Sequence, residues 1–495
     1  MKTIHHLISG EAVASSSGRT SPVFDPATGA QTGEVGLASV DEVDAAVASA
    51  KAAFESWREV SIAKRTKLMY EFRSLVVANA DEIAARLTAE HGKVLGDAGG
   101  EVARAIENIE FACGLATHLE GRHSEQASTG VDVYSVRRPL GVVAGITPFN
   151  FPAMVPMWML PNAVACGNTF VLKPSERDPS APLFIAELFH EAGFPPGVLN
   201  VVQGDKVAVD RLLEHPDVKA LSFVGSTPIA KYVYETGTSH GKRIQALGGA
   251  KNHMVVLPDA DIDLAADSAV SAAYGSAGER CMAISVVVAV GEVADPLVDA
   301  IRMRMEKLTI GPGTDPDSEM GPLVTAVHRD KVAGYIGEGA DAGATVVVDG
   351  RDAQFDGDGF FLGVTLLDHV TTDMSVYTDE IFGPVLCVVR ADTYHEAVEL
   401  IRTNQWGNGA AIFTRDGGAA RRFQEDADAG MLGINVPIPV PVGYHSFGGW
   451  KDSAFGDTTI YGPEGIHFYT RPKVVTSRWP DPAGSRVNLG FPTNS

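Results

Sequence analysis

Short apolar segments alternate with segments of helical periodicity after residue 141, and this alternation constrains the fold more than any other feature of the chain. In the first half, strands are predicted at Val142–Ile146, Thr169–Leu172, Val198–Val202 and Ala220–Val224. In the second half, strands are predicted at Ala283–Val290, Thr345–Val348, Val385–Val389 and Ala410–Phe413. Helical segments lie between them, as in parallel sheets that carry helices on both faces. The chain is therefore predicted to be an α/β protein.

Length and charge narrow the class further. At roughly 150 residues per domain, 495 residues are enough for two to four domains, and 45% hydrophobic residues can fill ordinary cores. The 40 Lys and Arg residues against 62 Asp and Glu residues give a net charge of −22. A surface this acidic disfavours non-specific binding to nucleic acid or to an anionic membrane. A local pair of arginines can still bind an anionic substrate.

Cysteine usage points to a reduced compartment. The cysteines are too few for a disulfide framework and lack the CxxC spacing of structural zinc sites; they are Cys113, Cys166, Cys281 and Cys387. The histidines form no ligand cluster either, so no metal is expected. The first residues lack the apolar run of a signal peptide, and prolines interrupt the long uncharged stretch Leu140–Leu172. A cytoplasmic location without a membrane span is expected.

Two segments look like half-exposed strands that lie outside the main sheets. Apolar and polar residues alternate over Val131–Val136 and again over Gly465–Trp479. We expect these segments to pair with each other and to cover a subunit edge in a homo-oligomer, either a dimer or a tetramer. The alternative is an ordinary surface hairpin.

Capping signals mark the beginnings of two helices. Ser39 and Glu42 have the spacing of a capping box, in which each side chain binds the backbone N–H of the other residue. Asp295 stands before Pro296, a residue suited to the first helical position, and is predicted to cap a helix over Pro296–Lys307.

Two clusters could carry a reaction. Cys281 follows Gly278-Glu279-Arg280 between a predicted helix and a predicted strand, where a thiol can act as a nucleophile. By local sequence alone, a buried and inert cysteine is the alternative. Asn150 lies in Thr147-Pro148-Phe149-Asn150-Phe151-Pro152 after a predicted parallel strand, where its amide could stabilise an oxyanion. A turn-stabilising Asn is the alternative there.

Three further strand-end clusters fit a dinucleotide. Lys173 and Glu176 could hold a ribose, and a carboxylate would repel a 2′-phosphate, which favours NAD over NADP. Gly225 and Ser226 precede a helix whose N-terminus suits a pyrophosphate. Glu380 could bind the second ribose. The chain has no G-x-G-x-x-G fingerprint, and ordinary turn chemistry is the alternative for each cluster taken singly.

The order of these motifs resembles the aldehyde dehydrogenase superfamily over essentially the full length. Pro-Phe-Asn-Phe-Pro, Lys-Pro-Ser-Glu, Phe-Val-Gly-Ser, Leu-Gly-Gly, Gly-x-x-Cys and Glu-Ile-Phe-Gly-Pro occur in the family's order. The resemblance implies an NAD-binding domain over 1–120 and 140–249 and a catalytic domain over 250–444. It also implies oligomerisation strands and a C-terminal arm over 121–139 and 465–495. The expected fold is thus two open α/β domains with a small β element.

The resemblance also assigns roles to residues. Cys281 is implied as the nucleophile and Asn150 as the oxyanion donor, and Phe382 is implied to pack near the nicotinamide. Lys173 and Glu176 look like ligands of the adenosine ribose, and Glu380 looks like the ligand of the nicotinamide ribose. Together, the implied cofactor-binding residues are Thr147, Phe149, Lys173, Glu176, Gly225, Ser226, Glu380 and Phe382.

One acid of the family pattern is missing. Hydrolytic members have Glu-Leu-Gly-Gly, whose Glu activates the water that cleaves the acyl-enzyme; here Ala246 or Leu247 stands at that position, depending on the alignment. Neither residue can take a proton. Water needs such a base, whereas a thiol with a pKa of about 8.5 needs less help and attacks thioesters well. The departure therefore points to coenzyme A as the acyl acceptor.

Several segments look like the methylmalonate-semialdehyde dehydrogenase (CoA-acylating) branch of the family. They are Ala250-Lys251-Asn252-His253, Arg280-Cys281-Met282-Ala283 and Asn435-Val436-Pro437-Ile438-Pro439-Val440-Pro441. The branch usually has Gln two residues before the nucleophile, whereas this chain has Glu279. That carboxylate could raise the pKa of Cys281 or serve as a substitute base; the alternative is a solvent-facing replacement.

The branch acts on short aldehydes that carry a β-carboxylate, and arginine suits such an anion. Arg280 and Arg104 are the candidate ligands, and a salt bridge of Arg104 with Glu101 or Glu107 is the alternative for that residue. The expected reaction converts malonate or methylmalonate semialdehyde to acetyl-CoA or propionyl-CoA, with NAD as oxidant and loss of CO₂. The rivals are a hydrolytic aldehyde dehydrogenase and a non-catalytic binding protein with the same fold.

Overall fold

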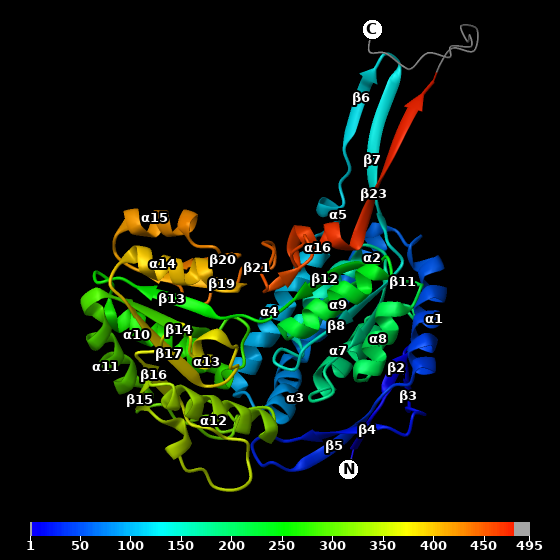
Figure 1. Cartoon of the computed structure of the whole chain (residues 1–495). Helices are drawn as coiled ribbons and strands as arrows, with labels where there is room; N and C mark the ends of the chain where they lie inside the picture. The colour runs from blue at the N-terminus through cyan, green and yellow to red at the C-terminus, as the bar shows by residue number, and fades with distance from the viewer. Residues whose placement is uncertain (1, 480–495) are drawn as a thin grey trace.

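The computed structural model describes residues 2–479, which form two α/β lobes and a projecting β arm (Figure 1). The first lobe contains an eight-stranded sheet; its order is β22 (Ala454–Phe455), β12 (Arg243–Leu247), β11 (Val218–Val224), β8 (Val142–Ile146), β9 (Thr169–Lys173), β10 (Leu199–Val201), β2 (His6–Ile8) and β3 (Glu11–Val13). The strands from β12 to β10 run parallel, and antiparallel β22 and β2 flank them. The predicted parallel sheet is therefore confirmed, with strand bounds within two residues.

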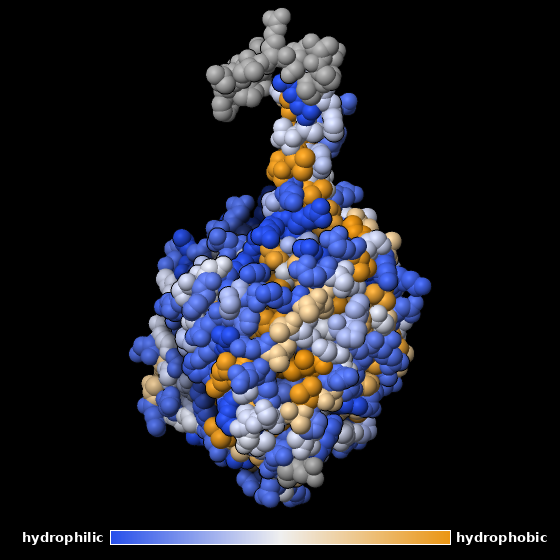
Figure 2. Space-filling view, turned by 90° about the vertical axis from the view of Figure 1, so that its right-hand side faces the viewer, coloured by the Kyte–Doolittle hydropathy of each residue, from blue (hydrophilic) through white to orange (hydrophobic). Residues whose placement is uncertain are grey.

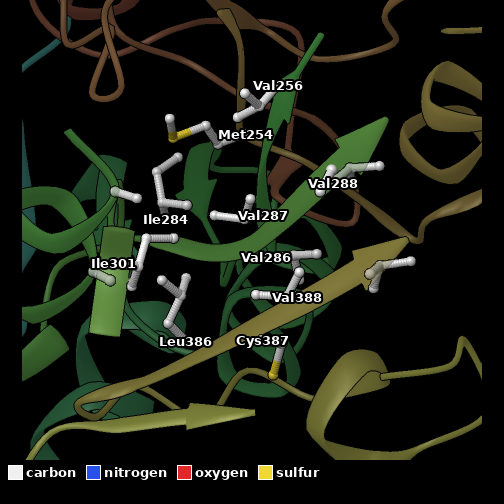
Figure 3. Packing of buried hydrophobic residues seen from close by; sticks show 14 of the residues in the cluster. Met254, Val256, Ile284, Val286, Val287, Val288, Ile301, Leu386, Cys387 and Val388 are labelled. Carbon is white, nitrogen blue, oxygen red and sulfur yellow. The ribbon is translucent and has the colours of Figure 1, made fainter. Parts of the chain in front are cut away.

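The second lobe contains a seven-stranded sheet. Its order is β15 (Thr345–Val348), β16 (Thr365–Asp368), β17 (Val385–Ala391), β14 (Ile284–Val290), β13 (Asn252–Val256), β19 (Gly409–Phe413) and β20 (Met431–Ile434). All of its neighbouring strands are parallel except β15 and β16. Figure 3 shows apolar side chains of the neighbouring strands β14 and β17 in the core of this lobe, among them Val286, Val287, Val288, Leu386, Cys387 and Val388. Such continuous apolar strands are expected where helices cover both faces.

Helices separate the strands in both lobes, as the sequence pattern predicts (Figure 1). In the first half of the chain they are α1 (Val40–Trp57), α2 (Ile62–Ala78), α3 (Ala80–His91), α4 (Leu95–Cys113), α5 (Leu115–His118), α6 (Met154–Ala165), α7 (Ser180–Glu191), α8 (Lys206–Glu214) and α9 (Thr227–Ser239). In the second half they are α10 (Ile262–Tyr274), α11 (Ala294–Met305), α12 (Ala326–Asp341), α13 (Ser375–Thr378), α14 (Tyr394–Thr403), α15 (Gly417–Asp426) and α16 (Gly462–Tyr469). No helix in the described part of the chain is both long and apolar enough to cross a membrane.

Of the two predicted helix starts, one is confirmed and one is wrong. Ser39 and Glu42 form the capping box of α1, since the Ser39 N–H donates to Glu42 Oε2 and the Glu42 N–H donates to Ser39 Oγ. Helix α11 begins at Ala294, one residue before Asp295, so Asp295 does not cap it. Its carboxylate instead forms an ion pair of 2.7 Å with Arg390 on β17. Asp295 therefore pairs with a residue that is distant in the sequence and does not cap its own helix.

The arm is a three-stranded antiparallel sheet in the order β23 (Thr470–Arg478), β7 (Val131–Pro139) and β6 (His123–Ser128). The predicted pairing of the two exposed segments is confirmed, with Val474 opposite Ser135. The expectation of a strand from Gly465 is wrong, because α16 runs to Tyr469 and packs on α6. Residues 480–495 of the predicted C-terminal arm lie outside the described residues.

The arm rises from the body of the protein and carries hydrophobic residues along its lower part (Figure 2). Tyr134 is 38% exposed and Val474 is 64% exposed. Both strands at the edges of the arm, β6 and β23, have one side free of a strand partner within residues 2–479. The remaining described strands form two small sheets. One pairs β18 (Trp406–Gly407) with β21 (Trp450–Lys451), and the other has the order β1 (Lys2–Ile4), β5 (Gln31–Gly36) and β4 (Thr20–Phe24).

Candidate active site

The carboxyl ends of first-lobe strands and the segments that precede β14 and β17 in the second lobe line one cavity of about 260 Å³. Phe149 and Asn150 follow β8, and Gly225 and Ser226 follow β11. The second lobe contributes Cys281 and the segment before β17. Ligands of open α/β sheets bind at such strand ends. The cavity is therefore the place where the predicted catalytic and cofactor-binding residues come together.

A left-handed turn brings Cys281 to this cavity. After α10, Ser276, Ala277 and Gly278 have φ values of 54°, 52° and 74°, a conformation that costs free energy for residues other than Gly. The Cys281 carbonyl then accepts hydrogen bonds of 3.0 Å and 3.1 Å from the side-chain amides of Asn252 and Asn408. Both the strained turn and the two amides fix where the thiol lies.

Cys281 differs from the other cysteines in its exposure. It is partly exposed, whereas Cys113, Cys166 and Cys387 are buried. Burial of the thiol, with a smaller contribution from the Glu380 carboxylate, raises the pKa of Cys281 to about 12. The thiol form is therefore stable in the absence of ligand, and a positive charge brought to the cavity would favour the thiolate.

Asn150 is held at the cavity by a buried ion pair. Lys93 Nζ donates to the Asn150 carbonyl at 2.7 Å and to Glu101 Oε2 at 2.6 Å, and both charged side chains are 0% exposed. Glu101 Oε1 accepts the N–H groups of Ala153 and Met154 at the start of α6, where a carboxylate is favoured by the helix dipole. The Asn150 side-chain amide has no hydrogen bond within the described residues, so its N–H groups are available for an oxyanion.

The strand ends of the first lobe fit a dinucleotide. Lys173 Nζ lies 3.0 Å from Glu176 Oε2. Burial alone would raise the pKa of Glu176, but Lys173, the Glu176 backbone N–H and Arg177 together lower it below its usual value. A Cβ at Gly225 would lie 2.5 Å from the Phe223 ring, so only Gly fits there. Ser226 precedes α9 without a side-chain cap, which leaves the first N–H groups of that helix open to a pyrophosphate.

Glu380 and Phe382 form the opposite wall. Glu380 Oε1 accepts the Ala250 N–H at 2.9 Å, and burial raises the pKa of Glu380 to about 7. Phe382 has a φ of 62°, a strained conformation that directs the chain into the cavity wall. Its ring centroid lies 5.9 Å from that of Phe149. The two predicted aromatic ligands thus meet edge to face.

Three of the predicted cofactor residues do not line this cavity. They are Thr147, Lys173 and Glu176. The Thr147 N–H donates to the Lys173 carbonyl at 3.1 Å, which joins the ends of β8 and β9. The Lys173–Glu176 pair lies at the end of β9, beside the strand that leads into the cavity.

The two candidate substrate arginines are both paired with carboxylates. Arg104 on α4 forms an ion pair of 2.7 Å with Glu107 and donates to the Pro441 carbonyl at 2.6 Å. Arg280 lies 2.6 Å from Asp97 and lines a separate cavity of about 600 Å³. The alternative expected for Arg104, a salt bridge with Glu107, is therefore present. A substrate carboxylate would have to compete with these partners.

No hydrolytic base stands where the family pattern has one. Ala246 is 0% exposed and Leu247 is 3% exposed in β12, and neither lines the cavity; Gly248 does. Among the residues of the described chain that line the cavity, Glu380 is the one that carries a carboxylate. The solvent-facing interpretation of Glu279 is wrong, because this side chain is 0% exposed. It also does not line the cavity.

Sequence analysis missed three cationic or titratable residues of the cavity wall, namely Arg177, His328 and Lys331. Arg177 directly follows the Lys-Pro-Ser-Glu motif, and its guanidinium carbon lies 4.8 Å from the Phe149 ring centroid. His328 and Lys331 are three residues apart on α12, a spacing that places them on one face. The helical spacing of His328 and Lys331 can be read from the sequence, but no local pattern indicates that their helix lies beside Cys281.

Comparisons with known proteins agree with this geometry. The model of the aldehyde dehydrogenase family matches residues 12–475. The malonate-semialdehyde dehydrogenase of Pseudomonas aeruginosa is 56% identical over 100% of both chains. Malonate-semialdehyde dehydrogenase 2 of Geobacillus kaustophilus is 50% identical over 97% of this chain and 99% of its own.

Two solved structures have the same fold. A protein from Sinorhizobium meliloti, named as a methylmalonate-semialdehyde dehydrogenase and solved with NAD, superposes with a TM-score of 0.96 at 53% identity over 97% of this chain and 99% of its own. The methylmalonate-semialdehyde dehydrogenase of Oceanimonas doudoroffii gives a TM-score of 0.96 at 54% identity over 98% of this chain and 99% of its own.

Proposed function

This chain belongs to the aldehyde dehydrogenase family, and we propose that it is an NAD-dependent, CoA-acylating dehydrogenase of malonate or methylmalonate semialdehyde. The observation that carries the proposal is the combination of Cys281 and Asn150 in one cavity with apolar Ala246 and Leu247 at the position of the hydrolytic base. The names of the relatives support the substrate class.

Cys281 and Asn150 perform the first step. The Cys281 sulfur attacks the aldehyde carbon, and the carbonyl oxygen becomes an oxyanion as the C–S bond forms. The unpaired side-chain amide of Asn150 and the backbone N–H of Cys281 stabilise that oxyanion. Lys93 contributes indirectly, because it fixes the Asn150 carbonyl and thereby the direction of the amide.

The cavity residues fit the oxidant. Gly225, Ser226, Glu380 and Phe382 line the cavity, with the Lys173–Glu176 pair at the neighbouring strand end. When bound, NAD⁺ supplies a positively charged ring that accepts the hydride from the thiohemiacetal, so that a thioester on Cys281 remains. Glu176 would accept hydrogen bonds from the ribose hydroxyls and would repel a 2′-phosphate, which favours NAD over NADP.

Transfer of the acyl group follows from the missing base. Loss of CO₂ from the β-carboxylate leaves a carbanion that the thioester stabilises as an enolate, and a proton then completes the acyl group. The thiol of coenzyme A attacks the thioester carbonyl, the Cys281 thiolate leaves, and acetyl-CoA or propionyl-CoA forms. Water would need a carboxylate base beside Cys281, and Glu380, the lining carboxylate of the described chain, already accepts the Ala250 N–H.

Oligomerisation, domain limits and location complete the proposal. We propose that the exposed apolar residues of the β arm are covered by a second copy of the chain in a dimer or tetramer; Val474 is 64% exposed on an edge strand. The domain limits are those stated from the sequence, 1–120 with 140–249 and 250–444. The acidic surface and the unpaired cysteines fit a cytoplasmic enzyme.

The test is NADH production from malonate semialdehyde with and without coenzyme A, together with identification of the acyl product. Sustained turnover that requires coenzyme A and yields acetyl-CoA is the expected result. Full turnover without coenzyme A, with a free acid as product, would show a hydrolytic enzyme. Cys281→Ala is the control: if this variant still forms NADH, the covalent scheme is wrong. If the wild-type protein forms no NADH under either condition, the chain is a non-catalytic binding protein with this fold.

A further inference from the structure

Glu279 is a fully buried carboxyl group that the proposed reaction does not use. It lies two residues before Cys281 and is 0% exposed. Its Oε1 accepts the Val324 N–H at 3.3 Å and lies 3.6 Å from His328 Nε2. Its Oε2 makes no hydrogen bond within the described residues and lies 3.7 Å from His91 Nε2. The carboxyl group thus sits between α3, α12 and the turn that carries Cys281.

The cations near Glu279 all have other contacts. Lys93 binds Glu101 and the Asn150 carbonyl, and Arg280 binds Asp97. The Arg177 guanidinium lies over the Phe149 ring. None of these side chains forms an ion pair or a hydrogen bond with Glu279 in the described structure, although Arg177 and Lys93 lower its pKa slightly through space. An ionised Glu279 would therefore be a buried charge without a paired cation, which is costly.

The two histidines are neutral. Burial lowers the pKa of His91 well below its usual value and lowers the pKa of His328 as well. His328 Nε2 lies 2.7 Å from the Phe382 carbonyl, which can only accept, so Nε2 carries the proton. Both ring nitrogens of His91 lack a hydrogen-bond partner within the described residues. His91 Nε2 can therefore serve as an unpaired acceptor that faces Glu279 Oε2 at 3.7 Å.

We propose that Glu279 is a protonated carboxylic acid that positions the Cys281 loop: one oxygen accepts from the Val324 N–H, and the other directs its proton toward the unpaired His91 Nε2, 3.7 Å away. A neutral carboxylic acid offers one donor and one acceptor, as a Gln amide does on its two sides. This accounts for Glu at a position where the related branch usually has Gln. The contact continues to the cavity, because the His91 ring stacks on Phe149 at 6.0 Å and Phe149 meets Phe382.

The proposal gives activity an upper pH limit. Burial raises the pKa of Glu279 to about 8. Above that pH the carboxyl group loses the proton that faces His91 and places a buried negative charge two residues from Cys281. At pH 9, about one tenth of the groups remain protonated, so an approximately tenfold loss of rate is expected. The groups that face Glu279 and set this limit are His91, Lys93, Arg177 and His328.

The test compares Glu279→Gln and Glu279→Leu with wild type from pH 6 to pH 10, with Glu235→Gln, 64% exposed on α9, as the matched control. For NADH production, Glu279→Gln is expected to equal wild type at pH 7 and to lack the tenfold loss at pH 9. Glu279→Leu keeps neutrality but has no donor or acceptor, so its kcat should be low at every pH. Glu235→Gln should follow wild type throughout.

Thermal unfolding provides a readout that needs no turnover. The unfolded carboxyl ionises at a pKa of about 4.3, whereas the folded one stays protonated to about pH 8. The native state therefore binds more protons between these values, and wild type loses stability there as pH rises. The Tm of Glu279→Gln minus that of wild type should increase from pH 5 to pH 8 and then level off.

Parallel pH profiles of Tm for wild type and Glu279→Gln would overturn the proposal, because Glu279 would then be ionised in the native state. A lower Tm of Glu279→Gln that does not recover relative to wild type between pH 5 and pH 8 would do the same and would point to an ionised Glu279. The kinetic arm rests on the proposed role of Cys281. The unfolding arm does not, so a failure of the proposed function is distinguishable from a failure of this inference.

Discussion

The loop that carries Asn150 and the loop that carries Cys281 line one cavity but are held by different interactions. Two opposite charges, Lys93 and Glu101, fix the first loop, and both are fully buried. A left-handed turn and the lone carboxyl group of Glu279 fix the second. The side chains of Lys93, Glu101 and Glu279 are all fully buried, so the two loops differ in whether the buried ionisable group has a partner of opposite charge. A compensated pair tolerates a wide pH range, whereas a single acid holds its loop only while it is protonated.

The largest expected effect comes from breaking the compensated pair. Lys93→Met leaves Glu101 as a buried, unpaired charge, which should cost about 3–5 kcal/mol of stability and lower kcat because Asn150 loses its anchor. The midpoint of urea unfolding and kcat measure the two effects. Lys206→Met, which removes an exposed pair with Asp210, is the control and should leave the unfolding midpoint almost unchanged. Equal losses for both variants would mean that burial of the Lys93–Glu101 pair contributes nothing.

A smaller effect should identify which arginine binds the substrate carboxylate. Arg104 lies on α4, the helix that also carries Glu101, and Arg280 directly precedes Cys281; each is paired with a carboxylate. Loss of a charged hydrogen bond to substrate costs about 1.5–3 kcal/mol, so Arg104→Leu should raise KM for malonate semialdehyde by roughly 10- to 150-fold. KM for propanal, which lacks the carboxylate, should stay within about twofold.

Arg280→Leu is the matched comparison for Arg104→Leu. If only one variant has a raised KM for malonate semialdehyde and an unchanged KM for propanal, the arginine replaced in that variant binds the carboxylate. If both variants behave in this way, both arginines bind it. Equal losses on both aldehydes in both variants would contradict the arginine assignment, since the effect would then be structural.

The smallest effect is expected in the strained turn. Ala277 has a φ of 52° and is 1% exposed. Replacing it with Gly relieves left-handed strain of about 1–2 kcal/mol, but it also removes a buried methyl group and adds freedom to the unfolded chain. Stability should therefore change by no more than about 1 kcal/mol. In the right-handed helix α10, Ala266→Gly has no strain to relieve and should lose at least that much by urea unfolding.

The sequence by itself determined the α/β fold and the residues at strand ends, because apolar periodicity and turn residues are local signals. The parallel strands, the capping box at Ser39 and the pairing of the arm strands were all predictable in this way. Family motifs also placed Cys281 and Asn150 among the candidate residues, and both line one cavity. Local signals failed where a distant partner intervened, as at Asp295, which pairs with Arg390 instead of capping α11.

Only the tertiary structure decided the environment of each titratable group. Nothing local connects Lys93 with Asn150, or Glu279 with His91 and His328, because these contacts join residues that are 49 to 188 positions apart in the sequence. A sequence specifies which side chains can ionise, whereas burial and neighbouring charges decide which of them do. For that reason the charged state of Glu279, and with it the proposed pH limit of the enzyme, could be inferred only once the lobes were in place.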